Sequence, residues 1–369
     1  MNNPIGSSTY FLRLLLVAMV GLLLATPSSA QEVCGLSSVQ FDALLGDGFE
    51  SLATPNAAAS GVTAVPPGKG KAGALGRADL GRPLGHAARI QAGVAPTILI
   101  LSPAAGASLP GRAFEVRGTF TGPLNTGITV NGVAARTFGN QWVSTGLRPP
   151  AGSFAIDAVA HTFDGQTASA ARSLTLGNAE PPLELRAAAP GNLAPATVGF
   201  NLRFQAGAVV ASVQIDFDGD GSNDYSGPLA GAPSGFLYAN PGLYTARAEA
   251  VVDGNPAVSE ASVVIADVVA NRLRACAVYG ELRASLTAND LEATLATFIP
   301  HQREALRPFF TALGDNRPLF ATRLGTIANG LIGFDQVTLV TLSIDNGEPI
   351  GNQLNIAADG EGVWRIGSF

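Results

Sequence analysis

The sequence predicts a multidomain, mostly β protein in which two all-β sandwiches precede a C-terminal α+β domain. Three observations support this prediction. The 369 residues exceed what a single hydrophobic core usually holds. Short β-rich runs, separated by Gly, Pro and Asn at intervals of about ten residues, fill residues 97 to 266, and this texture is typical of sandwiches. Helical periodicity followed by a strand meander occupies residues 267 to 369.

Residues 1 to 30 have the three-part layout of a secretory signal peptide. Arg13 precedes the apolar run LLLVAMVGLLLA, and Ser28 and Ala30 are small residues at the positions that signal peptidase reads. We therefore expect cleavage between Ala30 and Gln31, and export to the periplasm or the outside of the cell. The run is too short to span a bilayer comfortably, so a retained anchor is the less favoured alternative. No integral membrane segment is expected after cleavage.

Residues 31 to 96 are predicted to form a short N-terminal segment and a flexible linker. The linker is rich in Ala, Gly and Pro and shows neither helical nor alternating periodicity. Export would allow the two cysteines, Cys34 and Cys276, to form a disulfide. The alternative is a buried thiol, because Cys276 shares a helical apolar stripe with residues such as Val269 and Leu273.

Residues 97 to 177 are predicted to form the first sandwich. The runs TILILSP, AFEVRGTF, GITVNGVAA and DAVAHTFDGQTAS give the expected succession of strands and turns. This stretch resembles the bacterial immunoglobulin-like domains of exported proteins, including the glucodextranase-type accessory module. The matching features are scaffold features, so the resemblance implies a spacer or adhesion module without catalysis.

Residues 183 to 266 are predicted to form the second sandwich. In ASVQIDFD, the apolar residues Val213, Ile215 and Phe217 alternate with polar ones and should share one face. The segments IDFDGDGSNDY and FLYANPGLYTARAEAVVDG resemble the polycystic-kidney-disease (PKD) immunoglobulin-like domain in order and spacing. That resemblance implies an extracellular β-sandwich module that contacts protein or polysaccharide.

Residues 267 to 369 are predicted to form three helices and then a strand meander. Asn289 is expected to cap the second helix, with Asp290 and Glu292 in its first turn, and Gly314 is expected to end the third. The order of elements and the terminal DGEGVWRIGSF resemble the nuclear-transport-factor-two-like cone fold, with helices on a curved antiparallel sheet. The resemblance implies a pocket that binds a ligand or partner. The aromatic residues to watch there, although residues at such spacings more often belong to a core, are Phe309, Phe310, Phe320 and Trp364.

The sequence offers little for catalysis. Its three histidines, His86, His161 and His301, fall in the linker, the first sandwich and a polar helix start. No GxSxG elbow, Walker loop or Rossmann glycine motif is present, and two cysteines with three histidines are too few for a sizeable metal cluster. The net charge of −6 at pH 7 and a pI near 5.1 argue against nucleic acid as a partner.

The acidic stretch DFDGDGSNDYS is the best candidate for a cation site. Asp216, Asp218, Asp220 and Asp224 would fill positions one, three, five and nine of an EF-hand loop, but position twelve is Gly227, so an EF-hand is rejected. Two interpretations stay open. The carboxylates bind calcium, which would relieve their repulsion, or they cap backbone amides of a hydrated turn whose glycines supply positive φ.

The leading hypothesis is an exported, non-enzymatic modular protein for binding or adhesion at a bacterial envelope. Its partner would be a protein or a polysaccharide, and its only cofactor would be calcium. One alternative is a secreted hydrolase or isomerase with its pocket in the C-terminal domain. The other is a structural or oligomerisation protein.

Overall fold

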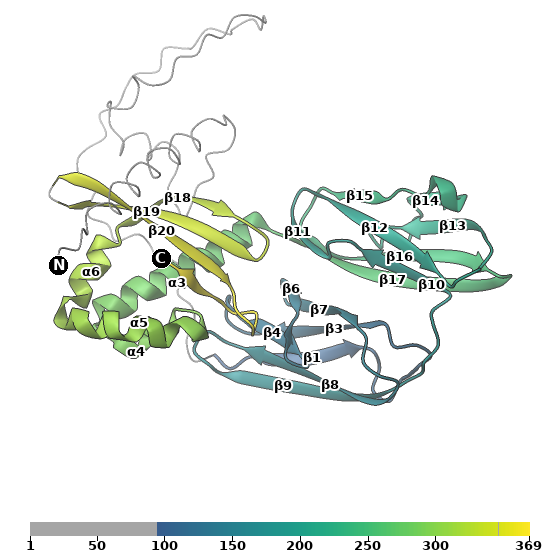
Figure 1. The fold of residues 1–369 in the computed structure, drawn as a ribbon, viewed down its shortest axis with the longest axis horizontal. Coiled ribbons are helices and arrows are strands. Elements are labelled where there is room, and N and C mark those ends of the chain that lie inside the picture. Colours follow the sequence, from purple (N-terminus) through teal and green to yellow (C-terminus); the bar gives the residue numbers. More distant parts are fainter. Residues whose placement is uncertain (1–93, 346) are drawn as a thin grey trace, which may run out of the picture. The chain divides into compact units, whose positions relative to one another are not determined.

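The computed structural model describes residues 94 to 345 and 347 to 369, and its elements carry the labels of Figure 1. The predicted signal peptide with its cleavage site at Ala30 and Gln31, nearly all of the linker with His86, and Cys34 lie outside the described residues. The prediction of a mostly β chain with several sheets and a few helices is confirmed. None of the described helices combines the length and the apolar character that crossing a membrane would require.

The first sandwich consists of two sheets that enclose one core. Their strand orders are β1-β3-β7-β6 and β2-β9-β8-β4-β5. All of their strand pairs are antiparallel except the parallel pair of β2 and β9. The core draws fully buried side chains from both sheets, among them Val116, Ile128, Trp142 and Ile156. The strands are β1 Thr97–Ser102, β2 Ser108–Leu109, β3 Phe114–Thr121, β4 Gly127–Val130, β5 Val133–Ala134, β6 Arg136–Phe138, β7 Gln141–Leu147, β8 Gly152–His161 and β9 Thr167–Leu176.

The second sandwich has the sheets β10-β12-β15 and β11-β17-β16-β13-β14. Val213, Ile215 and Phe217 are all buried in its core, so the face predicted from their alternation is confirmed. Asp253 and Gly254, both with positive φ, close the hairpin of β16 and β17. The strands are β10 Leu183–Ala187, β11 Gly191–Leu193, β12 Ala196–Phe204, β13 Val210–Asp216, β14 Tyr225–Gly227, β15 Gly235–Tyr238, β16 Gly242–Val252 and β17 Asn255–Ala266.

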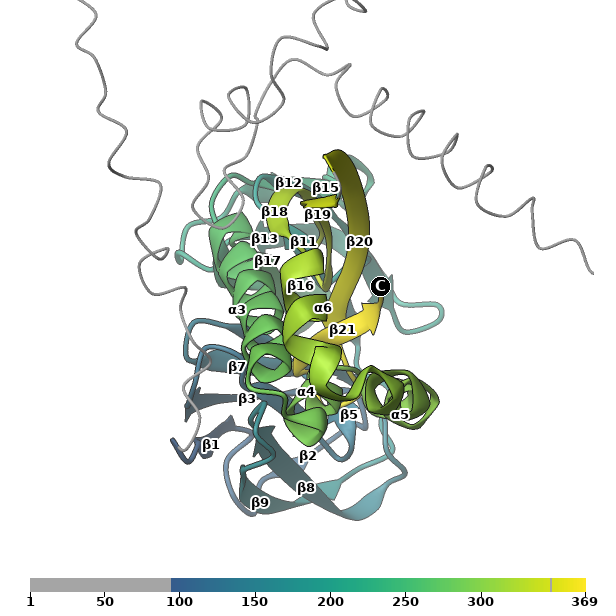
Figure 2. The ribbon, with the colours of Figure 1, turned by 90° about the vertical axis from the view of Figure 1, so that its left-hand side faces the viewer.

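The C-terminal region packs helices on one face of the antiparallel sheet β18-β19-β20-β21. Figure 2 shows α3 and α6 lying side by side in front of that sheet. The helices are α3 Val268–Thr287, α4 Leu291–Ala296, α5 Pro300–Leu313 and α6 Arg317–Arg323, and the strands are β18 Thr326–Ile332, β19 Gln336–Asp345, β20 Glu348–Ala358 and β21 Trp364–Ser368. α6 and β18 were not predicted from the sequence, although Pro318 in the first turn of α6 is a usual helix-start signal.

The predicted N-terminal cap of the second helix was wrong by one residue. Asp290, not Asn289, caps α4, because its side chain accepts a hydrogen bond from the Ala293 N–H at 3.0 Å. Asn289 has a φ of 57° and instead closes the turn after α3.

The predicted apolar face of α3 is buried only in its second half. Val269 and Leu273 are 46% and 42% exposed, while Tyr279, Leu282 and Leu286 of the same predicted face are buried. Apolar and polar residues are mixed around all sides of the helix, so periodicity alone does not select its inner face. Cys276 is half-buried and disulfide-bonded. Its pairing with Cys34 stays a prediction, since Cys34 lies outside the described residues.

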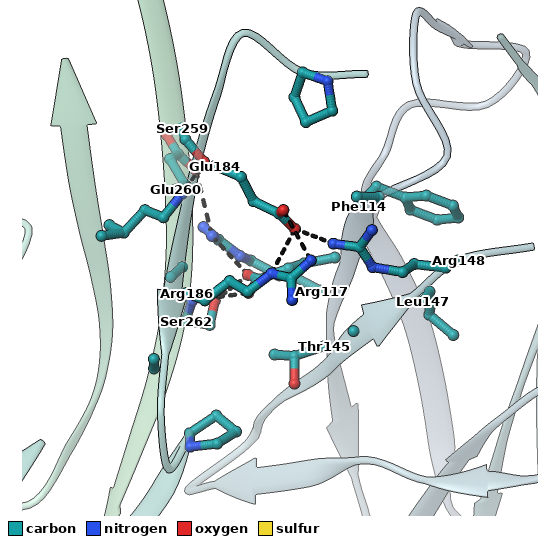
Figure 3. A pocket seen from close by; sticks show the side chains of 18 of the residues that line it. Phe114, Arg117, Thr145, Leu147, Arg148, Glu184, Arg186, Ser259, Glu260 and Ser262 are labelled. Atoms are coloured by element: carbon teal, nitrogen blue, oxygen red, sulfur yellow. Dashed lines mark hydrogen bonds and ion pairs between the residues drawn. The ribbon is translucent and has the colours of Figure 1, made fainter. Parts of the chain in front are cut away.

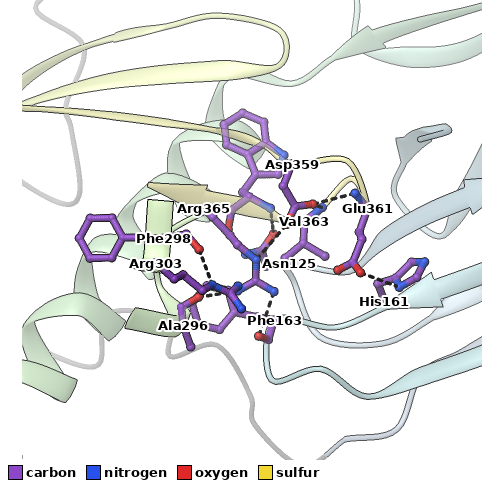
Figure 4. Close-up of polar contacts among 11 residues, drawn as sticks. Asn125, His161, Phe163, Ala296, Phe298, Arg303, Asp359, Glu361, Val363 and Arg365 are labelled. Atoms are coloured by element: carbon purple, nitrogen blue, oxygen red, sulfur yellow. Dashed lines mark hydrogen bonds and ion pairs between the residues drawn. The ribbon is translucent and has the colours of Figure 1, made fainter. Parts of the chain in front are cut away.

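A buried ion pair joins the end of β20 to the last strand. The guanidinium of Arg365 lies 2.9 Å from Asp359, and the two side chains are 4% and 3% exposed. Arg365 also donates to the carbonyl oxygens of Ala296 and Phe163, at 2.6 and 3.2 Å, and its guanidinium lies 4.8 Å from the ring centroid of Phe163 (Figure 4). Phe163 belongs to the first sandwich, so this one side chain links α4, β21 and the turn after β8.

Asn125 adds a second link between the same regions. Its side-chain amide donates to the carbonyl oxygen of Trp364 and accepts from the Trp364 N–H, both at 2.8 Å. The Asn125 amide thus gives Trp364 of β21 the same donor and acceptor that a residue of a neighbouring strand would give. Next to it, a Cβ on Gly127 would collide with the backbone of residues 361 to 363, so glycine is required for this close approach.

The first prediction concerns Arg365. Replacing it with Met should lower the free energy of unfolding by about 3–5 kcal/mol, because Asp359 would be left as a buried charge without its partner. Adding Asp359→Leu to that variant should recover part of the loss, since the orphaned charge is then removed. Urea denaturation of the full chain measures both effects.

The matched control is Arg307→Ala, which breaks an ion pair with Glu292 on the surface. That change should have little effect on the free energy of unfolding, as the loss of an exposed ion pair usually does. A loss for Arg365→Met no larger than the loss for the control would contradict the structural role of the buried pair.

Candidate functional site

The four predicted aspartates lie in and around the turn between β13 and β14. Oxygen atoms of Asp216, Asp218 and Asp224 all lie within 4.8 Å of one another, so these three carboxylates could hold one cation. Asp216 is buried, Asp218 is half-buried and Asp224 is exposed. Asp220 is not part of this group, and its side chain accepts a hydrogen bond from the Ser222 N–H at 2.7 Å. The structure therefore brings three of the four residues together.

The same carboxylates also cap the backbone of the turn. Asp216 accepts hydrogen bonds from the N–H groups of Gly219 and Gly221, at 2.7 and 2.9 Å. Asp224 accepts from the Phe217 N–H at 2.7 Å. Gly219 and Gly221 have φ values of 76° and 89°, as the hydrated-turn interpretation requires. Capping and cation binding are compatible, because each carboxylate oxygen has more than one acceptor position.

Electrostatics favour a cation at this turn. Burial, followed by the charges of Asp220, Asp224 and Asp216, raises the pKa of Asp218. Beneath the turn, the Tyr238 hydroxyl donates to the carbonyl oxygen of Phe217 at 2.7 Å, and burial with the nearby carboxylates raises the pKa of Tyr238. A hard, oxygen-liganded ion such as Ca²⁺ would relieve the repulsion among these groups. The three carboxylates are therefore the kind of ligand that Ca²⁺ takes in proteins.

We predict that excess Ca²⁺ raises the midpoint of thermal unfolding relative to chelator. Calcium at about 100 times its Kd would contribute about 2.7 kcal/mol. Asp218→Asn should abolish this difference. In chelator, the same variant should be as stable as the parent or slightly more so. The raised pKa means that the folded chain holds the Asp218 proton more tightly than the unfolded chain does, so the carboxylate charge weakens folding as pH rises through that pKa.

Asp220→Asn is the matched control for the calcium prediction. It removes a carboxylate from the same turn but not from the three-carboxylate group. The calcium response should therefore survive in this variant. Identical melts of the parent protein in calcium and in chelator would leave the hydrated turn as the correct interpretation.

A second candidate site is a cleft of about 660 Å³ between the two sandwiches (Figure 3). One wall comes from β3 and the end of β7, and the other from β10 and the middle of β17. The charged residues that line it are three arginines and three glutamates: Arg117, Arg148, Arg186, Glu115, Glu184 and Glu260. A volume of this size is typical of ligand sites in proteins.

Two arginines share one carboxylate inside the cleft. Glu184 forms ion pairs with Arg148, across the cleft, and with Arg186, at 2.8 Å on the same strand. Burial by itself would raise the pKa of Glu184. The hydrogen bonds and charge interactions with the two arginines outweigh burial and lower this pKa overall. Glu184 is therefore held in its charged form, and the two guanidinium groups together have more donors than it can accept.

Arg117 organises the other end of the cleft. One guanidinium nitrogen of Arg117 lies 3.1 Å from a carboxylate oxygen of Glu115 and 3.3 Å from one of Glu260. Another donates a hydrogen bond to the Thr245 hydroxyl at 3.1 Å. Glu115 in turn accepts hydrogen bonds from the N–H and the hydroxyl of Ser262, at 2.9 and 2.6 Å. These contacts cross from β3 of the first sandwich to β16 and β17 of the second.

The cleft residues were not predicted from the sequence. The six charges come from four separate segments of the chain, and no segment contains more than two of them. The available signal was indirect, because charged residues make up only 14% of the chain and five of these six lie within strands.

The four aromatic residues singled out in the C-terminal region do not line a cleft of this kind. Phe310 and Trp364 are buried, and Phe309 is 42% exposed. The rings of Phe309, Phe310 and Phe320 pack against one another, with centroids 5.1 to 6.3 Å apart, and Phe298 and Phe369 join the same cluster. Three of the four residues therefore pack in one aromatic cluster, as the core interpretation expected.

The described histidines serve as surface or structural groups. His301 is exposed on the first turn of α5. His161 makes a 2.9 Å hydrogen bond with the Thr129 hydroxyl, and its other ring nitrogen lies 3.8 Å from Glu361 (Figure 4). The structure thus brings neither histidine to the acidic turn or to the cleft.

No protein-family model matches the sequence, and no curated protein matches it. Among solved structures, the chain is similar to the fibronectin(III)-like modules of Clostridium thermocellum CbhA, with 15% identity, a TM-score of 0.18, and coverage of 46% of this chain and 94% of that chain. It is also similar to the N-terminal Ig1-2 module of the Drosophila receptor protein tyrosine phosphatase DLAR, with 10% identity, a TM-score of 0.21, and coverage of 47% and 100%.

A third similar structure is dimeric latent PorU from Porphyromonas gingivalis, with 10% identity, a TM-score of 0.29, and coverage of 47% of this chain and 20% of that chain. All three TM-scores are below 0.5. The sandwich architecture of this chain therefore rests on the strand pairing and shared cores described above.

Proposed function

We propose that this chain is an exported, non-enzymatic modular binding protein whose two sandwiches hold a polar partner in the cleft between them. In this proposal the first sandwich is a bacterial immunoglobulin-like module, the second a PKD-like module and the C-terminal region a nuclear-transport-factor-two-like domain. The predicted signal peptide supports export to the periplasm or beyond. Calcium at the acidic turn serves as a brace and takes no part in chemistry.

The observation that carries the proposal is the cleft itself. It has the volume of a ligand site, and its lining combines three arginines, three glutamates and apolar residues such as Phe114 and Leu147. Residues from both sandwiches contribute, so the site exists only where the two modules meet. The proposal therefore puts the binding site between the sandwiches and not in the C-terminal region, where we first expected it.

The non-enzymatic part of the proposal rests on how the polar groups of the C-terminal region are used. Asp359 is neutralised by Arg365, and Glu292 by Arg307. An acid or base for proton transfer needs a pKa near the working pH, and the hydrogen bond from Arg307 lowers the pKa of Glu292 instead. The aromatic cluster fills the adjoining interior.

We predict that the mature protein binds members of a peptide or glycan array, and that Arg148→Ala weakens this binding at least about tenfold, a change of about 1.4 kcal/mol. Arg148 crosses the cleft to Glu184, and its side chain is 49% exposed, so it can contact a partner without first being uncovered. Titration of the strongest array member gives the Kd of each variant.

The control is Arg307→Ala, which removes another solvent-exposed arginine, from α5 and outside the cleft lining. It should bind like the parent. Equal weakening by both changes would point to nonspecific charge attraction. Strong binding that neither change affects would place the binding site elsewhere, and a failure to bind any array member would contradict the proposed function itself.

A further inference from the structure

The charged residues that line the cleft form two clusters, and the first has an excess of positive charge. It consists of Arg148, Arg186 and Glu184, so two guanidinium groups share one carboxylate. The shared carboxylate is the most covered of the three groups, because the Glu184 side chain is 17% exposed and the two arginine side chains are 49% and 38% exposed. The cluster therefore presents guanidinium groups to the solvent in the cleft, with more N–H donors than Glu184 can use.

The second cluster has an excess of negative charge. It consists of Arg117, Glu115 and Glu260, so one guanidinium group serves two carboxylates. Glu115 is also held by the N–H and the hydroxyl of Ser262, whereas the Glu260 side chain is 48% exposed and meets Arg117 at 3.3 Å. Glu260 is therefore the negative charge of this cluster that a ligand can reach.

The residues beside the second cluster do not cancel its negative excess. Arg247 is the cross-strand neighbour of Glu260, but it forms an ion pair with Glu249 on its own strand. The charges of Arg247 and Glu249 offset each other. The cleft lining is therefore neutral in total and polarised, with an accessible positive charge at Arg148 after β7 and an accessible negative charge at Glu260 of β17, on the opposite wall (Figure 3).

We propose that the cleft binds a segment of a partner protein in which an acidic side chain lies close to a basic one. This inference rests on the proposed function and names the partner class of the same site. The acidic side chain meets Arg148 and Arg186, and the basic one meets Glu260. Side chains carry this recognition, because β17 runs along the outer edge of β10 and Ser259 takes the Leu185 N–H.

A polypeptide fits this charge pattern better than a glycan does. A polypeptide can carry side chains of both signs, so it can satisfy both clusters at once. An acidic polysaccharide repeats charges of one sign, and Glu260 would repel them. A neutral glycan brings no charge to either cluster, so covering these arginines and glutamates would cost free energy without an ionic partner in return. Apolar lining residues such as Phe114 and Leu147 can contact the other side chains of a peptide.

The test uses the full mature protein and an array of short random-sequence peptides, with neutral and uronic-acid oligosaccharides on the same array. The strongest peptide binders should contain an acidic and a basic residue close together in sequence. One binder is then labelled and titrated by fluorescence anisotropy. Arg148→Ala should raise its Kd about tenfold, and Glu260→Gln, which removes a half-exposed charge, should raise it about threefold.

The matched controls are Arg307→Ala and Glu304→Gln. They remove one positive and one negative charge from α5, where the two side chains form a surface ion pair outside the cleft lining. Neither change should alter the Kd. Thermal melts of all variants confirm that each is folded, so a change in Kd reports on binding.

Paired changes in the peptide and in the protein identify which charges meet. Replacing the acidic residue of the peptide with its amide should weaken binding to the parent and have little further effect on Arg148→Ala. Replacing the basic residue with norleucine should likewise have little further effect on Glu260→Gln. A peptide whose basic residue is exchanged for Glu should recover binding to Glu260→Lys. A purely structural role of Arg148 or Glu260 would not produce this pairwise pattern.

Three results would overturn the inference. The first is that the strongest binders are peptides with charges of only one sign or with none. The second is that the peptide changes and the protein changes act independently, which would mean that these charges do not meet in the complex. The third is selective binding of an oligosaccharide that Arg148→Ala weakens, which would make the partner a glycan. In each case the protein still binds a partner, so the proposed function stands, whereas a failure to bind any array member would contradict the proposed function itself.

Discussion

The buried guanidinium of Arg365 is the interaction on which the contacts around the last strand depend. A charge in a dry interior is costly unless it is paired and hydrogen-bonded, and here Asp359 supplies the countercharge while two carbonyl oxygens take further N–H donors. One of those carbonyls belongs to Phe163 of the first sandwich. The chain therefore satisfies a buried charge only when regions about 200 residues apart in sequence are folded and in contact.

The same constraint of satisfying polar groups explains the cleft. The first strand of the second sandwich pairs with one sheet as β10 and with the other as β11, so the outer edge of β10 runs along β17 without a main-chain ladder between them. Open edges invite uncontrolled pairing, and proteins manage them with charges or covering segments. In this chain Glu115 of the first sandwich caps Ser262, and Ser259 caps Leu185. Side chains thus take the place of main-chain pairing where β10, β17 and the first sandwich meet.

Features that a local sequence pattern decides could be predicted, and features that depend on contacts between distant residues could not. The alternation of Val213, Ile215 and Phe217 placed all three in a core, because period two has one solution once a face is buried. The cap of α4 shifted by one residue to Asp290, since both candidates are good caps and only the turn geometry distinguishes them. The cleft could not be predicted, because Arg148 and Glu184 meet only through the packing of two domains.

The acidic turn and the cleft are connected through one residue of β16. Gly219 of the turn packs so closely on Thr245 that a Cβ there would come within 2.7 Å of the Thr245 carbonyl oxygen. The hydroxyl of Thr245 accepts a hydrogen bond from Arg117, which also holds Glu115 and Glu260 in the cleft. A cation that stiffens the turn would therefore restrict the strand that positions Arg117. On this view calcium acts on binding by ordering one wall of the cleft, and it needs no direct contact with the partner.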